Sequence, residues 1–189
     1  MTTKCFYRTN IQCQDLIDKN FKFPLVENFF VSVLHIDKVI NPGWLNYSKS
    51  LNLNFFTGML FYRTPNFYRE TAHIDLHPRL HTPVPGAFNF IIGGKDSDMV
   101  WYELPNKKLE IMYTDAGSPF VEWPIKDLKE IDRYSIKENE IVLVRTDVPH
   151  QIEMKEQPRW CVSMRFQHME NYSWESLVKI LYDNHLMAN

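Results

Sequence analysis

The chain has 189 residues, enough for one ordinary domain with a sizeable core and too few for two comfortable ones. Its 21 lysines and arginines nearly balance its 23 aspartates and glutamates without any run of like charge, which gives no electrostatic footprint for a nucleic-acid backbone or an anionic membrane. The 3 cysteines, Cys5, Cys13 and Cys161, are too few and too scattered for a disulfide framework or a zinc site, so a reducing compartment fits best.

The N-terminal sequence has no apolar segment typical of a signal peptide, and no stretch approaches the roughly 18 apolar residues of a membrane span. We therefore expect a soluble, cytoplasmic protein with one domain over residues 1–189.

Short apolar or alternating runs predict strands, because they are rich in β-branched and aromatic residues and end at turn formers such as GGKD and DAGSP. In chain order they are FFVSVLHI from Phe29, LNFFTGMLFYR from Leu53, GAFNFIIGG from Gly86, MVWYEL from Met99, LEIMYT from Leu109, EIVLVRT from Glu140 and RWCVSMRF from Arg159. Between residues 53 and 166 no long helical pattern interrupts them, which predicts a mainly β domain with a sandwich or barrel core.

Two helical patterns flank this core. The first, NPGWLNYSKSL at residues 41–51, follows the first predicted strand. The second covers residues 173–187, where Ser173 is a residue type that caps helix N-termini. The apolar residues after it recur at helical spacing: Trp174, Leu177, Val178, Leu181 and Tyr182. We expect both helices to cover the sheet from outside.

A histidine-rich stretch, ETAHIDLHPRLH at residues 70–81, contains His73 and Asp75 two residues apart, and the same spacing occurs earlier at His35 and Asp37. With 7 histidines and 23 acidic residues, His-x-acid should occur about once by chance, so the motif alone is weak. Residues two apart on a strand point to the same face, so the spacing can present an imidazole and a carboxylate to one metal ion. On this pattern a ligand role and a structural role both stay open for His73 and Asp75.

His150 is the best candidate for a third ligand, because it follows the apolar run EIVLV, where a strand would deliver it to the end of a sandwich. Two histidines and one carboxylate on one face suit non-haem Fe(II) and leave positions open for substrate and oxygen. The earlier pair stands at the end of the first strand, just before a helical stretch. We interpret Asp37 as helping to start that helix and His35 as packing beneath it.

Three segments together resemble the Fe(II)- and 2-oxoglutarate-dependent oxygenases: AHID at residues 72–75, IVLVRTDVPHQIEM around His150, and PRWCVSMRF ending at Phe166. The resemblance covers roughly residues 53–166 and implies a double-stranded β-helix, or jelly-roll, core with flanking helices. It also implies a catalytic iron site formed by His73, Asp75 and His150. The cosubstrates would be 2-oxoglutarate and molecular oxygen, and the reaction would hydroxylate a C–H bond while releasing succinate and carbon dioxide.

The same resemblance implies that an arginine opening the last strand binds 2-oxoglutarate. Here that residue is Arg159, nine residues after His150. Many members carry serine or threonine two residues after this arginine, where this chain has Cys161, so we assign the hydroxyl to Ser163 on the same face of the strand. Arg165 shares that face and is interpreted as a surface or rim salt bridge.

Tyr62 and Asn89 lie on the strands before and after His73, at positions that the superfamily often uses to contact cosubstrate or substrate, and both are predicted to do so here. The primary substrate is expected to be a peptide side chain or a small molecule rather than a nucleobase, because the chain has no basic surface. A function of another class also stays open: a cupin-like jelly roll that binds a metal without redox chemistry or has only a structural role.

Overall fold

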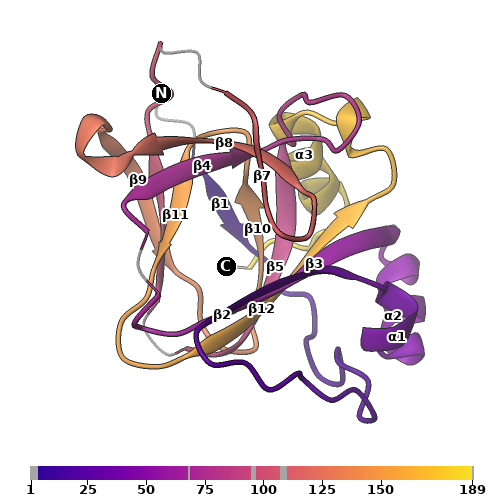
Figure 1. Ribbon diagram of the computed structural model, residues 1–189. Coiled ribbons are helices and arrows are strands. Elements are labelled where there is room, and N and C mark those ends of the chain that lie inside the picture. Colours follow the sequence, from indigo (N-terminus) through magenta and orange to yellow (C-terminus); the bar gives the residue numbers. More distant parts are fainter. Residues whose placement is uncertain (1–3, 68, 95–96, 107–109, 189) are drawn as a thin grey trace.

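The computed structural model describes residues 4–67, 69–94, 97–106 and 110–188, which form two antiparallel sheets facing each other as a β-sandwich (Figure 1). The larger sheet consists, in spatial order, of β1 (Phe6–Arg8), β10 (Ile141–Arg145), β5 (Gly86–Gly93), β12 (Arg159–Phe166), β3 (Phe55–Arg63) and β2 (Phe29–Leu34). The smaller sheet consists of β7 (Met112–Tyr113), β8 (Pro119–Pro124), β4 (Thr71–Asp75), β11 (His150–Glu153), β6 (Asp98–Tyr102) and β9 (Glu130–Ser135).

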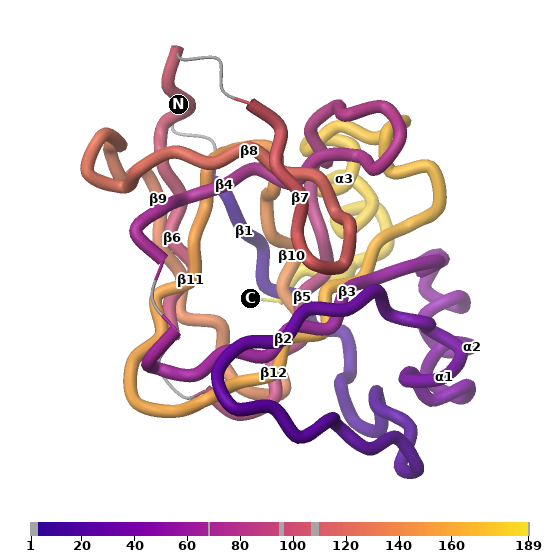
Figure 2. Tube along the Cα trace, viewed as in Figure 1, coloured from indigo at the N-terminus to yellow at the C-terminus, as the bar shows by residue number. Residues whose placement is uncertain are grey.

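Neighbouring strands come from distant parts of the chain. Strand β12 pairs with β3 on one side and with β5 on the other, so the last strand of the sequence lies in the middle of the larger sheet (Figure 2). In the smaller sheet β11 lies between β4 and β6. These pairings bring the two halves of the histidine pattern into one sheet.

The alternation of side chains along β12 explains the two largest cores. Val162 and Met164 are fully buried and point away from the other sheet, into a core shared with the helices. Cys161 points the opposite way and packs with Met99 and Trp101 of the smaller sheet. Polar residues on this second face therefore lie between the sheets, where they are shielded from solvent.

Helices cover the outer face of the larger sheet, as expected from the sequence. They are α1 (Ile36–Val39), α2 (Pro42–Ser50) and α3 (Trp174–Asp183). Two short 3-10 turns lie at Ile125–Asp127, against the smaller sheet, and at Met169–Asn171. The predicted cap of α3 is confirmed: Ser173 Oγ accepts a hydrogen bond from the Ser176 backbone N–H at 3.2 Å. Among the described residues, no helix is long and apolar enough to cross a membrane.

The predicted strands are confirmed where the apolar runs are long. The run from Leu109 produces only the short β7, and Leu109 itself lies outside the described residues. Strands β1, β4, β8, β9 and β11 lie outside the predicted runs. Strand β1 is short, and β9 carries charged residues on an edge of its sheet.

Candidate metal centre

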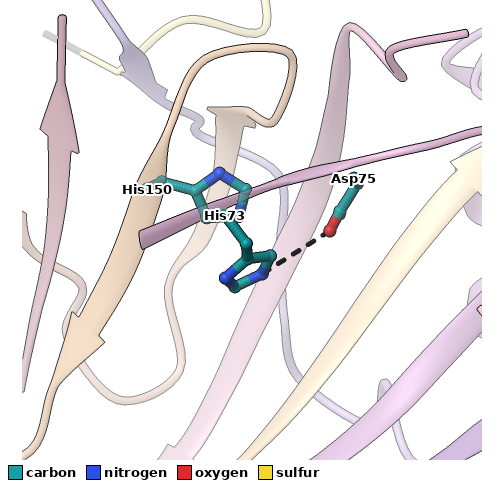
Figure 3. A group of neighbouring side chains, drawn as sticks. All are labelled: His73, Asp75 and His150. Carbon is teal, nitrogen blue, oxygen red and sulfur yellow. Dashed lines mark ion pairs between the residues drawn. The ribbon is translucent and has the colours of Figure 1, made fainter. Parts of the chain in front are cut away.

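His73, Asp75 and His150 come together on the face of the smaller sheet that looks toward the larger one. His73 and Asp75 lie two residues apart on β4, and His150 opens β11, where it pairs directly with His73. The three side chains approach one another (Figure 3), and one ligand atom from each can be chosen so that all lie within 4.8 Å of one another. The group could therefore hold a metal ion.

Both histidines are kept in the neutral form that binds metals. His150 Nδ1 lies 3.0 Å from the Val148 carbonyl oxygen, which can only accept a hydrogen bond, so Nδ1 carries the proton and Nε2 keeps its lone pair. Burial, reinforced by the proximity of His150, lowers the pKa of His73 to about 3. Burial also lowers the pKa of His150. At neutral pH the pair offers two uncharged nitrogen donors.

Asp75 supplies the carboxylate of the group and is itself held by an arginine. Arg165 Nη2 donates a hydrogen bond to Asp75 Oδ2, whereas Asp75 Oδ1 lies 3.6 Å from His73 Nε2. Burial alone would raise the pKa of Asp75, but the charge of Arg165, the proximity of His150 and His73 and the hydrogen bond from Arg165 together outweigh burial and keep this pKa below 3.8. The salt bridge predicted for Arg165 therefore exists, but its partner is a metal-ligand candidate and only 16% of the Arg165 side chain is exposed. Such a contact orients a ligand.

The candidate metal-binding group, which consists of His73, Asp75 and His150, stands between two cavities. An inner cavity of about 50 Å³ and an outer cavity of about 130 Å³ are both lined by His73 and Asp75. The outer cavity continues into a groove of about 610 Å³, with which it shares Met59, Ser118 and Arg165. A single water needs about 10–15 Å³ of such space. The inner cavity thus has room for a short chain of a few non-hydrogen atoms beside the group.

Three residues predicted from the sequence line the inner cavity: Arg159, Asn89 and Ser163. Arg159 is only 3% exposed, and its Nη1 donates to Ser97 Oγ at 2.7 Å, with no carboxylate partner among the described residues. Asn89 Oδ1 is buried and accepts no hydrogen bond from the described part of the chain. A buried guanidinium that meets no carboxylate of the described residues fits a ligand with an anionic end, and the Asn89 amide oxygen adds a place for a donor or water.

Tyr62 is not brought to the site. Its ring packs against Trp160, with the centroids 4.8 Å apart, on the opposite face of the sheet. Its neighbours Phe61 and Arg63 line both cavities instead. Successive strand residues point to opposite faces, so a prediction displaced by one residue selects the wrong face. Arg63 is thus a site residue that the sequence analysis missed. The usable signal was that Phe61 and Arg63 lie two apart on one strand and so share a face.

The earlier His-x-Asp motif lies elsewhere. His35 is the N-cap residue of α1, but its side chain makes no capping hydrogen bond and is exposed, so the expected packing beneath the helix is wrong. Asp37 occupies the first turn of α1, where a negative charge is favourable, as predicted. Neither residue lines the two cavities beside the metal-binding group.

Comparison with known proteins adds little. No family of known proteins matches the sequence, and no curated protein matches it. Among solved structures, one that matches is the X-ray structure of E. coli ycfD, with 13% sequence identity and a TM-score of 0.38. The match covers 97% of this chain but only 46% of that chain, so this chain spans less than half the length of the protein it matches.

Proposed function

We propose that the chain is an Fe(II)- and 2-oxoglutarate-dependent oxygenase that hydroxylates a C–H bond of a peptide side chain or small molecule. One observation carries the proposal: the His73, Asp75 and His150 group stands at the junction of two cavities, and the inner one contains the buried guanidinium of Arg159. Two imidazoles and one carboxylate are the donor set that suits non-haem Fe(II).

The strand order supports a jelly roll for this proposal. Numbering β3 to β6 and β9 to β12 as eight core strands gives the order 6-3-8-1 in the larger sheet and 2-7-4-5 in the smaller one. The chain therefore crosses from one sheet to the other at nearly every step, and the β6–β9 pair closes the far end. This two-sheet winding is the arrangement expected of a jelly roll.

Bound iron and 2-oxoglutarate would together supply the chemistry, in which oxygen and 2-oxoglutarate yield succinate, carbon dioxide and one oxygen atom inserted into a substrate C–H bond. The residues of the chain supply position and charge. His73, Asp75 and His150 would hold the metal from one side, while Arg165 fixes the orientation of Asp75.

The inner cavity would receive the distal carboxylate end of 2-oxoglutarate, while the keto-acid end would lie at the metal. Arg159 can bind the distal carboxylate with two parallel hydrogen bonds, because its planar guanidinium matches a carboxylate. Ser163 and Asn89 line the same cavity and can add hydrogen bonds. The outer cavity and the groove beyond it give a substrate access to the same metal from the other side.

The test combines iron affinity with formation of succinate from 2-oxoglutarate. The wild-type protein should bind one Fe(II) per chain, and Asp75→Ala should lose both iron binding and succinate, because two neutral imidazoles alone are a poor match for the ion. Arg159→Gln should keep iron but need a higher 2-oxoglutarate concentration for half-maximal turnover. The loss of a buried ionic contact, about 2–4 kcal/mol, corresponds to a rise of about 30- to 1000-fold.

Arg165→Gln separates the two arginines. Its main effect should be on iron affinity through Asp75, with 2-oxoglutarate affinity changed much less than in Arg159→Gln. Unchanged iron affinity in Asp75→Ala would refute the metal site. Tight metal binding without any metal-dependent consumption of 2-oxoglutarate would refute the oxygenase and favour a non-redox, cupin-like protein.

A further inference from the structure

Arg63 is a charged residue of the site that the proposed chemistry does not use. It is the last residue of β3 and lies directly opposite Arg159 on β12 and Phe29 on β2. Its side chain shares a face with Phe61 and lines both the inner and the outer cavity, next to His73. It therefore points into the same space as the metal-binding group.

The guanidinium of Arg63 has no counter-ion in the described part of the chain. Among the described residues it makes no hydrogen bond or ion pair, and its contacts are with two stacked rings: its Cζ lies 6.0 Å from the Phe29 centroid and 5.9 Å from the Phe67 centroid. Burial, with repulsion from Arg159 and Arg69, lowers its pKa to about 10, which still leaves it charged at neutral pH. Cation–π contacts stabilise a charge by less than the desolvation penalty of an unpaired guanidinium, so these two rings do not replace an anionic partner.

The other arginines of the site each have a polar partner. Arg165 is bound to Asp75, and Arg159 donates to Ser97 deep in the inner cavity. Arg69 is 40% exposed, lies 3.9 Å from Glu122, and lines the outer cavity together with Arg63 but not the inner one. Arg63 and Arg69 thus bring positive charge to the outer cavity in addition to Arg159. Two carboxylates also line this cavity, but Asp75 is already paired with Arg165 and Asp115 is exposed.

We infer that the primary substrate carries a carboxylate and that Arg63, supported by Arg69, binds this group in the outer cavity. The cosubstrate already has a cation in Arg159, whereas Arg63 and Arg69 share the outer wall with the rings of Phe29 and Phe120. These surroundings suit a carboxylate attached to an apolar or aromatic body. The inference rests on the proposed function only in calling this ligand the substrate, since binding itself requires no metal.

The experiment uses benzoate and its neutral isostere benzamide as probes of the metal-free, full-length chain. Benzoate should bind, and benzamide should bind at least about tenfold more weakly, because it lacks the charge that forms ionic hydrogen bonds. Arg63→Gln should weaken benzoate binding at least about tenfold. The affinity of Arg63→Lys should fall between those of the wild type and Arg63→Gln, and Arg159→Gln should change benzoate binding little. Arg8→Gln, at an exposed arginine outside both cavities and the groove, is the matched control and should bind benzoate like the wild type.

A measurement without substitutions locates the probe. Met59 lines the outer cavity and Met99 the inner one, so their methyl groups report separately in NMR of methionine-labelled protein. Contacts between benzoate and the Met59 methyl would support the inference. Contacts with Met99, equal binding of benzamide, or loss of benzoate binding in Arg159→Gln as much as in Arg63→Gln would overturn it. All outcomes are independent of iron, so the inference can fail while the proposed oxygenase stands.

Discussion

Replacing Arg165 with methionine should destabilise the metal-free protein by about 2–3 kcal/mol, because it leaves the Asp75 carboxylate without its ionic partner. Breaking a fully buried ion pair by removing one member costs about 3–5 kcal/mol, whereas exposed pairs are worth about 0–1 kcal/mol. The two side chains are 16% and 25% exposed, which places this pair between these limits and nearer the buried one. The free energy of unfolding from urea titration at neutral pH measures the effect.

The dependence on pH follows from the direction of the Asp75 shift. The folded-state pKa of Asp75 lies below its ordinary value of 3.8, so the carboxylate contributes stability above that pH and loses it as the pH falls through the folded value. In Arg165→Met the carboxylate loses both the charge and the hydrogen bond of Arg165, so its pKa should rise. The difference in the free energy of unfolding between the wild type and Arg165→Met should therefore be largest at neutral pH and shrink on acidification. It should vanish once Asp75 is protonated in both proteins.

A double substitution completes this test. In an Asp75→Asn background, Arg165→Met should cost much less than in the wild type, because both charges of the pair are then absent. A destabilisation by Arg165→Met that is equally large in the Asp75→Asn background, or that persists in acid, would refute the reasoning that the ion pair is its origin.

Three further outcomes are expected. Gly94→Ala should lower the free energy of unfolding by about 2–4 kcal/mol in urea titration, because φ at Gly94 is +67° and an added Cβ would lie 2.2 Å from Arg159 Cβ. Displacement of Arg159 should also weaken 2-oxoglutarate binding, and unchanged binding would contradict this prediction. Asp98→Asn should lower the free energy of unfolding by about 2–3 kcal/mol at neutral pH, because Asp98 is only 5% exposed, accepts a hydrogen bond from Arg133 at 3.0 Å and pairs with Lys155. The folded-state pKa of Asp98 is lowered, so urea titrations below that pKa should no longer show the difference. His35→Ala should leave iron binding intact and change stability by less than about 0.5 kcal/mol, because the side chain is exposed; loss of iron would reverse the choice between the two motifs.

Much of the β-sandwich and of the metal-binding group could be predicted from the sequence, because both depend on local patterns. Apolar runs predicted the central strands of the larger sheet and β6 of the smaller sheet, but not β4 or β11. The two-residue spacing correctly placed His73 and Asp75 on one face of a strand. His150 was selected because it follows an apolar run, but the strand formed by that run, β10, ends at Arg145, and His150 instead opens β11 in the other sheet. The structure brings these three residues together as that reasoning requires.

The remaining features of the site depend on long-range pairing, which has no local signal. The partner of Arg165 is Asp75, 90 residues away, and only the sandwich makes them neighbours. Tyr62 and Arg63 differ by one position, and which of them faces the cavity is set by the register of β3 against β12. Strand β9 escaped prediction because an exposed edge carries charges in place of an apolar run.

The central position of β12 has a consequence for hydrogen exchange. This strand carries Arg159, Ser163 and Arg165, and its backbone is paired on both sides, with β3 and with β5. Amide protons of a strand bonded on both sides exchange mainly when the whole domain opens. The amides of β12 should therefore be among the slowest-exchanging in the protein. Because the backbone that carries these site residues is already ordered, ligand binding should cost little conformational entropy there.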